Sequence, residues 1–219
     1  MKPYFTKTPN WIKTLYPNQV WSLPNSNKEI YLTFDDGPTP EITDWVLNTL
    51  QKYSAKATFF CIGNNIEKYP SIFENIIKAD HSIGNHTYNH EKGWKTKDEE
   101  YVNSVSKTEK IIEKTKKNSE LKTLNSELLF RPPYGKMKKS QIKLLRKNNY
   151  KIIMWSVLSA DFDTTINAEK CLNNVIKNAK SGDIIVFHDS IKAFEKLKMV
   201  LPKVLEYYSE KGYKFDRIN

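Results

Sequence analysis

Residues 29–62 read EIYLTFDDGPTPEITDWVLNTLQKYSAKATFFCI, and this stretch sets the architecture expected for the whole chain. The apolar run at 29–34 predicts a strand, and the apolar run at 57–62 predicts a second one. Between them, apolar residues recur at helical spacing, which predicts a helix over 40–53. A strand, a helix and a further strand in this order are typical of a parallel sheet covered by helices.

The same alternation continues along the rest of the chain. Further helices are predicted at 69–79, 98–117, 140–148, 168–180 and 194–211, and further strands at 82–85, 127–131, 151–157, 183–187 and 214–218. With about seven alternations, the sequence predicts a single-domain α/β fold, a distorted (β/α) barrel of about seven parallel strands. This domain covers residues 28–219, and residues 1–27 form an N-terminal extension that is expected to pack on the barrel.

Composition excludes several classes of protein. Apolar residues make up 39% of the 219 residues and aromatic residues 12%, enough for a sizeable core, so the chain is not disordered. No apolar run approaches the roughly 18 residues of a membrane span. Lysines and prolines interrupt residues 1–17 before a secretory signal can form. Because Cys61 and Cys171 form no disulfide framework either, these features predict a cytoplasmic protein.

The chain is basic, with 35 Lys and Arg against 25 Asp and Glu and a net charge of +10. Lysines between 107 and 117 are interpreted as the solvated face of the helix at 98–117. No nucleic-acid-binding motif accompanies the charge, so nucleic acid is not expected as a partner. A peripheral contact with a membrane or an anionic polymer stays open, because aromatic and basic residues mix in residues 1–28. We expect a monomer.

Two acidic residues and two histidines stand near predicted strand ends. Asp35 and Asp36 end the first strand, where neighbouring side chains point in opposite directions. His86 and His90 are four residues apart, a spacing that on one helical turn lets both imidazoles reach one metal ion. Histidines so spaced are often ordinary surface residues, but this chain has only four, and three lie within ten residues. With one carboxylate they predict a catalytic His₂Asp metal site.

Other predicted strand ends carry Arg131, Asp161 and His188. Arg131 is suited to hold a carboxylate ionised. The two-proline turn after it is suited to present the backbone N–H of Tyr134 to a developing oxyanion. His188 is suited to act as a general acid, and Asp161 to orient a histidine. His81 matches none of these patterns and is interpreted as structural.

Together these residues resemble the polysaccharide deacetylases of carbohydrate esterase family four, the chitooligosaccharide deacetylase homology domain, over roughly residues 28–219. The matching motifs are TFDDGP at 33–38, HTxxH at 86–90, RxPY at 131–134 and, with Val in place of Leu, LxH at 186–188. The resemblance implies a metal-dependent enzyme that hydrolyses the N-acetyl amide of an amino sugar in a peptidoglycan- or chitin-like glycan and releases acetate. It implies Zn²⁺ as the metal, with Co²⁺ or another divalent ion as the alternative.

The resemblance also implies a role for each matching residue. Asp35 becomes the general base and His188 the general acid, with Asp161 tuning the histidine. Arg131 positions Asp35, and the Tyr134 N–H lines the oxyanion hole. The residues implied as metal ligands are Asp36, His86 and His90. The residues implied at the substrate pocket are Pro133, Tyr134, Phe162 and Val186.

The chain departs from the family at the fourth motif, normally DxxDW, where residues 158–162 read LSADF. Leu158 replaces the first Asp and Phe162 replaces the Trp, whereas Asp161 is retained. These changes alter the shape and polarity of the expected sugar pocket, so the substrate can differ from chitin-like polymers. Two alternatives remain open: a deformylase or deacetylase of a lipid-linked amino sugar, and a catalytically silent carbohydrate-binding module of the same fold.

Overall fold

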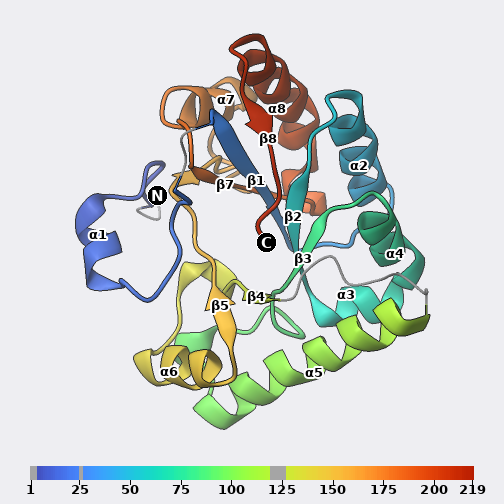
Figure 1. Cartoon of the computed structure of the whole chain (residues 1–219), viewed down its shortest axis with the longest axis vertical. Coiled ribbons are helices and arrows are strands. Elements are labelled where there is room, and N and C mark those ends of the chain that lie inside the picture. Colours follow the sequence, from blue (N-terminus) through green and yellow to red (C-terminus); the bar gives the residue numbers. More distant parts are fainter. Residues whose placement is uncertain (1–3, 25–26, 119–126) are drawn as a thin grey trace.

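A computed structural model describes residues 4–24, 27–118 and 127–219. Within these residues, helices surround a curled parallel sheet (Figure 1). The strands are β1 (Glu29–Asp35), β2 (Ala57–Cys61), β3 (Ser82–Asn85), β4 (Leu128–Phe130), β5 (Tyr150–Ile152), β6 (Val157–Leu158), β7 (Ile184–His188) and β8 (Lys214–Phe215). The α-helices are α1 (Asn10–Leu15), α2 (Ile42–Lys52), α3 (Gly63–Lys68), α4 (Pro70–Lys78), α5 (Asp98–Asn118), α6 (Lys139–Lys147), α7 (Ala168–Ile176) and α8 (Ile191–Glu210), and the 3-10 helices are η1 (Gly93–Lys95) and η2 (Pro133–Gly135).

The strands follow the order β5-β4-β3-β2-β1-β7-β6, with β8 paired to the start of β1, and every pairing is parallel. The predicted single-domain α/β fold, a distorted barrel, is thereby confirmed. The central strand β1 is buried from Ile30 to its end, as expected of a parallel strand covered on both faces. Phe34 stacks on Phe59 and Phe187, at ring-centroid distances of 5.0 and 6.0 Å, and so joins β1 to its two neighbours β2 and β7.

The run at 151–157, predicted as one strand, forms the two separate strands β5 and β6. Between them, the N–H of Ile153 donates to the carbonyl of Phe130 in β4 at 2.8 Å. The N–H of Ser156 instead donates to the carbonyl of Ile184 in β7 at 3.0 Å. The segment therefore crosses from one end of the sheet to the other. Because most of the crossing is buried, its apolar pattern is continuous and conceals the break.

Several helix boundaries differ from the prediction, and α7, for example, ends at Ile176, four residues before the predicted end at 180. The short helix α3 was not predicted, and it is separated from α4 by a proline at the first position of α4, Pro70, where proline is favoured. Helix α8 begins at Ile191, three residues before the predicted start at 194. A six-residue helix such as α3 is too short to show a helical apolar period, so the sequence carries little sign of it.

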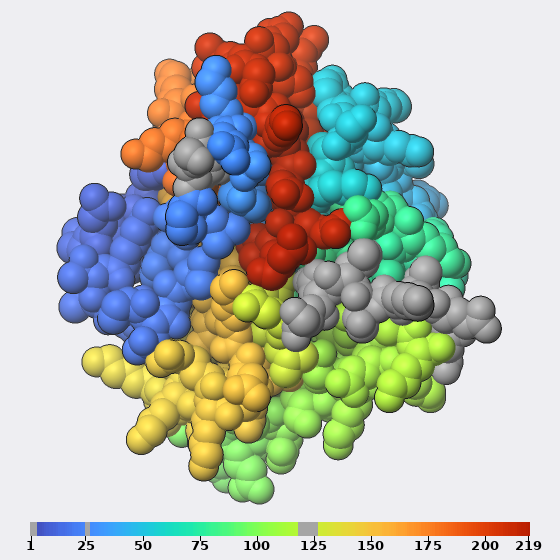
Figure 2. Space-filling view, viewed as in Figure 1, coloured from blue at the N-terminus to red at the C-terminus, as the bar shows by residue number. Residues whose placement is uncertain are grey.

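Residues 4–24 run along the opening between β5 and β6, and in Figure 2 this segment (dark blue) lies beside α6 (yellow). The N–H of Val20 donates to the carbonyl of Ile152 at 2.8 Å, and the carbonyl of Val20 accepts from Met154 at 2.7 Å. Further along, the N–H of Leu158 donates to the carbonyl of Thr6 at 2.9 Å. The segment thus supplies backbone partners to the part of the chain that crosses between the sheet ends. Of the helices in the described residues, none combines the length and apolar character needed to cross a membrane.

Candidate active site and metal centre

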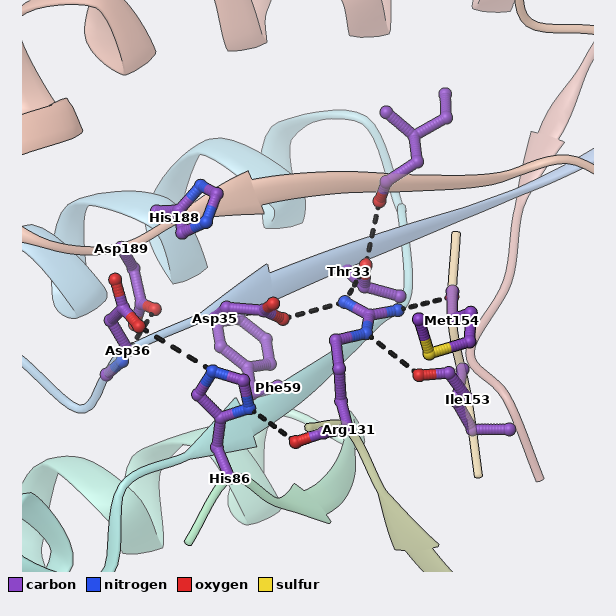
Figure 3. A network of polar contacts seen from close by, with 12 residues as sticks. Thr33, Asp35, Asp36, Phe59, His86, Arg131, Ile153, Met154, His188 and Asp189 are labelled. Atoms are coloured by element: carbon purple, nitrogen blue, oxygen red, sulfur yellow. Dashed lines mark hydrogen bonds and ion pairs between the residues drawn. The ribbon is translucent and has the colours of Figure 1, made fainter. Parts of the chain in front are cut away.

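Most of the residues singled out in the sequence meet at the carboxyl ends of the parallel strands (Figure 3). Asp35, at the end of β1, lies beside His188, the last residue of β7, because the two are register partners. Strands β3 and β4 are also paired, which brings His86 and Arg131 together just beyond their ends. The carboxyl ends of parallel strands lie at one face of the sheet, so four distant segments build a single site.

A buried ion pair joins Arg131 to Asp35. The Nη1 of Arg131 donates to Asp35 Oδ1 and to Thr33 Oγ1, each at 2.7 Å. The Nε and Nη2 atoms donate to the carbonyls of Ile153 and Met154 at 3.2 and 2.9 Å. A buried guanidinium is tolerated only when its donors are matched in this way. Arg131 is therefore fixed, and it holds the Asp35 carboxylate in one orientation.

Asp36, His86 and His90 converge so that one donor atom from each lies within 4.8 Å of the others. The Asp36 Oδ1 lies 3.7 Å from Nε2 of His86 and 3.3 Å from Nε2 of His90. The prediction that both histidines share a helical turn is wrong, because the segment that carries them is a loop. Thr87 and His90 have φ angles of 66° and 59°, and the Thr87 N–H donates to the Asn85 side chain at 3.0 Å. The hydrogen bond from the Thr87 N–H to the Asn85 side chain thus stabilises a turn in place of a helix.

The donor atoms of these three residues fit a divalent metal ion. Asp36 Oδ1 is a buried oxygen without a hydrogen-bond partner in the described part of the chain. Nδ1 of His86 lies 2.7 Å from the carbonyl of Arg131, which only accepts, so Nδ1 carries the proton and Nε2 offers its lone pair. Burial, and then the neighbouring His90, lower the pKa of His86 to about 3, which keeps the ring neutral as a ligand must be. Two imidazoles and one carboxylate are a donor set typical of catalytic divalent-metal sites.

His188 is paired with Asp161, a juxtaposition that the sequence predicted. Its Nδ1 lies 2.8 Å from Asp161 Oδ1, and its backbone N–H donates to Asp161 Oδ2 at 2.7 Å. Burial opposes charging of the imidazole, but the fully buried Asp161 outweighs it and raises the pKa of His188 to about 9. The ring therefore holds its proton at neutral pH, and with Nδ1 engaged, Nε2 is the nitrogen left to donate.

Asp189 is a residue of this site to which the sequence reasoning gave no role. Its Oδ1 accepts from the Gly37 N–H at 3.0 Å, and its Oδ2 accepts from Thr43 Oγ1 at 2.6 Å. Its own N–H donates to the carbonyl of Asp35 at 3.1 Å. Burial raises the pKa of Asp189 to about 8. Asp189 thus anchors the turn that carries Asp35 and Asp36, and its place directly after His188 was the one available signal.

Aromatic rings stand on two sides of the site. The exposed ring of Tyr134 lies 4.5 Å from His90 and 5.4 Å from Trp94, measured between ring centroids. On the other side, Phe162 meets His188 edge-on at 5.1 Å. Trp94 was not predicted, because it belongs to the short helix η1 and to none of the recognised motifs. These rings give the site apolar faces of the kind that saccharide rings pack against.

Two other residues predicted at the substrate pocket are buried. Pro133 begins η2 and sets the turn in which Tyr134 takes a φ of 60°. Val186 is fully buried in an apolar cluster with Leu158 and Ala160. Leu158, which stands where the family has an acidic residue, therefore packs in an apolar environment that a carboxylate would not fit.

Comparison with known proteins identifies relatives along most of the chain. Residues 22–153 match the family model described as polysaccharide deacetylase. The chain is 37% identical over 197 residues to a peptidoglycan-N-acetylglucosamine deacetylase of Bacillus cereus, covering 90% of this chain and 89% of that protein. It is 33% identical to a chitooligosaccharide deacetylase of Azorhizobium caulinodans, with 78% of each chain covered. The crystal structure of the Bc1960 peptidoglycan N-acetylglucosamine deacetylase, in complex with 4-naphthalen-1-yl-N-oxidanyl-benzamide, superposes with a TM-score of 0.85 at 32% identity, covering 96% of this chain and 95% of that chain.

Proposed function

The chain belongs to the polysaccharide deacetylase family, carbohydrate esterase family four, and we propose that it hydrolyses the N-acetyl amide of an amino sugar in a glycan. The reaction consumes water and yields acetate and a free amine. The predicted family and the predicted enzyme class are confirmed by these relatives. The observation that carries the proposal is the grouping, at one face, of the Asp35–Arg131 pair, the three converging donor atoms and the His188–Asp161 pair.

Asp36, His86 and His90 would hold the metal ion, and their donor set favours Zn²⁺, with Co²⁺ or another divalent ion as the alternative. When bound, such an ion polarises the acetyl carbonyl and lowers the pKa of water. The hydrogen bond from His86 Nδ1 to the carbonyl of Arg131 keeps the His86 ring aimed at the shared site.

Asp35 serves as the general base in this proposal. Arg131 engages its Oδ1, whereas no hydrogen bond within the described residues engages its Oδ2. The Oδ2 atom is therefore left to accept the proton of the attacking water. Since Arg131 is itself held by two backbone carbonyls, the carboxylate needs no rearrangement to act.

His188 serves as the general acid. The amine that leaves the tetrahedral carbon needs a proton before the C–N bond breaks, and the raised pKa of His188 keeps one on the ring near neutral pH. The backbone N–H of Tyr134 is proposed to stabilise the developing oxyanion. No hydrogen bond from that N–H is recorded among the described residues, so it is available to substrate.

The substrate we propose is a glycan that carries carboxylates, of the peptidoglycan type. Lys92 Nζ lies 5.6 Å from the ring centroid of Tyr134, and Lys136 Nζ lies 5.2 Å from that of Trp94. A sugar ring can pack on these aromatic faces while the two ammonium groups attract a neighbouring carboxylate. The B. cereus relative is named for peptidoglycan and the A. caulinodans relative for chitooligosaccharide. These two glycans are therefore the substrates to be compared.

The experiment is acetate release from two soluble substrates by zinc-loaded protein: N-acetylated chitooligosaccharides and peptidoglycan fragments. Asp35→Asn provides the blank, and Asp44→Asn in helix α2, a carboxylate with no role in the proposal, provides the matched control. We expect normal release with the control variant and at least about 100-fold slower release with the blank. Faster release from the carboxylate-bearing fragment, lost in Lys92→Gln/Lys136→Gln, supports the substrate class. Absence of acetate from both substrates contradicts the proposed reaction.

The cytoplasmic location, the monomeric state and the division of the chain at residue 28 stay predictions from the sequence. Cell fractionation and analytical ultracentrifugation test the first two. The described part of residues 1–27 forms backbone hydrogen bonds with the rest of the domain. Deletion of this segment tests whether it is a separable extension.

A further inference from the structure

The N-terminal segment exposes an unusual number of large apolar side chains. Phe5, Trp11 and Leu15 are 53%, 59% and 63% exposed, and Tyr16 is 37% exposed. These four make up half of the eight exposed large hydrophobic side chains in the described part of the chain. Phe5 and Trp11 are also in edge-on contact, at 6.3 Å between ring centroids, and Leu15 lies one turn after Trp11 on α1, so these three side chains form one patch.

A basic helix borders this patch. Helix α6 and the end of α1 enclose an open groove of about 680 Å³, with Leu15 and Tyr16 on one wall. The basic side chains on the other wall are Lys139, Lys143, Arg146 and Lys147. In Figure 2 the two elements adjoin on the same face of the molecule. We define the α1–α6 surface as these four basic residues together with Phe5, Trp11, Leu15 and Tyr16.

No acidic side chain from the two segments offsets the charge of this surface. The sequence has no Asp or Glu before Glu29, and none between Glu127 and Asp161. Asp183, which lies near the N-terminal segment, is already paired with Lys7 at 2.6 Å. Among the described residues, no ion pair is recorded for the four basic side chains that line the groove. The surface therefore presents a positive field next to exposed apolar rings.

We propose that the α1–α6 surface docks on a membrane that contains anionic phospholipids. Aromatic and aliphatic side chains enter the boundary between headgroups and acyl chains, while neighbouring lysines and arginines attract the negative leaflet. A soluble polyanion would satisfy the basic side chains but would leave Trp11 and Leu15 in water. The presence of both features on one surface therefore favours lipid. This docking is independent of the proposed hydrolysis, because none of its residues belongs to the candidate active site.

The test is co-sedimentation of the full chain with vesicles of phosphatidylcholine alone and of phosphatidylcholine mixed with phosphatidylglycerol. The first variant is Trp11→Ser/Leu15→Ser, and the second replaces Lys139, Lys143, Arg146 and Lys147 by Gln. The matched control replaces four exposed lysines outside the α1–α6 surface, Lys110, Lys114, Lys117 and Lys203, by Gln. Circular dichroism and acetate release from a soluble oligosaccharide verify that each variant is folded and unchanged at the active site.

We expect binding to the anionic vesicles only. Since each basic residue at such a membrane contributes about fivefold, the basic-to-Gln variant should lose on the order of 100-fold or more in partitioning. The aromatic variant should also weaken binding, and the matched control should lose clearly less than the groove variant. Equal losses in control and groove variants would overturn the proposal, as would an absence of binding. Binding to soluble polyphosphate that the aromatic variant leaves unchanged would assign the surface to a soluble polyanion instead.

Discussion

Asp35 and Asp36 are adjacent in the chain, yet the fold gives them different partners. Asp35 is the last residue of β1 and forms the buried ion pair with Arg131. Asp36 follows with a φ of 82°, and its carboxylate lies toward His86 and His90. The alternation of side chains along a strand already separates two neighbours, and the left-handed backbone at Asp36 completes the separation. This separation supports the roles proposed above, in which Asp35 is the base and Asp36 a metal ligand.

Substitution of Asp35 tests the first of these roles. We expect Asp35→Asn to lower kcat by about 10²–10⁴-fold, because it removes the base, while metal affinity stays within a few-fold. The amide oxygen can still accept from Arg131, so a folded protein is expected. Acetate release and competition with a chromophoric chelator measure the two properties. If Asn at this position releases the metal, the roles of the two aspartates are exchanged.

Substitution of His90 tests the second role. His90→Ala removes one of three converging donors, so both metal affinity and acetate release should fall by at least about 10-fold. The neighbouring Asn89 is exposed and is not among the three donors, and Asn89→Ala is the matched control. Competition with a chromophoric chelator measures the metal affinity of both variants. A His90→Ala protein that binds metal normally and remains active is incompatible with the proposed ligand set.

The connection from β1 to α2 is held by a residue from the connection between β7 and α8. A Cβ added at Gly37 would lie 2.0 Å from Asp189 Oδ2, so this turn has no room for any other side chain. Asp189 in turn bonds to Gly37, Thr43 and the backbone of Asp35. Two loops that are about 150 positions apart therefore behave as one rigid element beneath the site.

Enlarging this glycine tests that element. We expect Gly37→Ala to cost about 1–3 kcal/mol of unfolding free energy, because Asp189 must shift, and to reduce acetate release by at least 10-fold. Gly212, with a φ of 74° and nothing within 4 Å of its added Cβ, is the control. Gly212→Ala should cost only the backbone strain and leave turnover unchanged. Urea unfolding measures the stability of both variants, and acetate assays measure their turnover. Normal turnover in Gly37→Ala would contradict a rigid turn.

A buried histidine directly before β3, His81, should couple stability to pH. The N–H of Ala57 in β2 donates to Nδ1 of His81 at 3.2 Å, and burial, then Lys56, lower the pKa of His81 to about 4. Between pH 6.5 and 4, His81 is protonated in the unfolded state but stays neutral in the folded state. The unfolding free energy should therefore fall as the pH falls, by about 2 kcal/mol between pH 6.5 and 5.

Urea unfolding at pH 7 and pH 5 measures this effect, with His81→Asn as the reference. The Asn side chain can accept from Ala57 but does not titrate, so it isolates His81 from the other groups that titrate in this range. The loss of stability on acidification should be smaller in the variant by about the stated amount. Equal losses in the two proteins would show that His81 does not resist protonation.

At the scale of the whole molecule, the sheet does not close by strand pairing alone. Strands β5 and β6 stand at its two ends, and the chain between them bonds to β4 on one side and to β7 on the other. Residues 4–24 supply further backbone partners there, and Val20 and Leu23 pack against the buried cluster that contains Ile153. The N-terminal segment is therefore part of the barrel wall.

Deletion of residues 1–24 tests this integration. We expect the thermal midpoint to fall by at least about 5 °C, because the edge of the barrel loses hydrogen bonds and buried apolar area. Acetate release should fall as well, since Tyr4 packs edge-on against Phe162 beside His188. Deletion of residues 1–3 alone is the control. An unchanged midpoint after the longer deletion would show that the segment is a dispensable extension.

Much of this organisation is local and so could be read from the chain. Each strand and helix has its own apolar period, and the motif residues sit directly after predicted strands, so the barrel, the family and the candidate residues were all accessible. The alternation of elements also implied that these residues would meet, because parallel strands end at one face. The specific pairs Arg131 with Asp35 and Asp161 with His188 were implied by the family resemblance, and both are present in the structure.

What depended on packing could not be read in this way. Asp189 acts through groups far away in sequence, and Trp94 reaches the site from a short helix outside any motif. Residues 151–157 conceal a break because most of the crossing is buried. The loop at His86–His90 keeps the spacing of a helical turn but takes its shape from the Asn85 side chain and positive φ angles. Residue spacing in the sequence determines the local helices and strands. Burial and contacts between distant segments are set only by the packing of the folded chain.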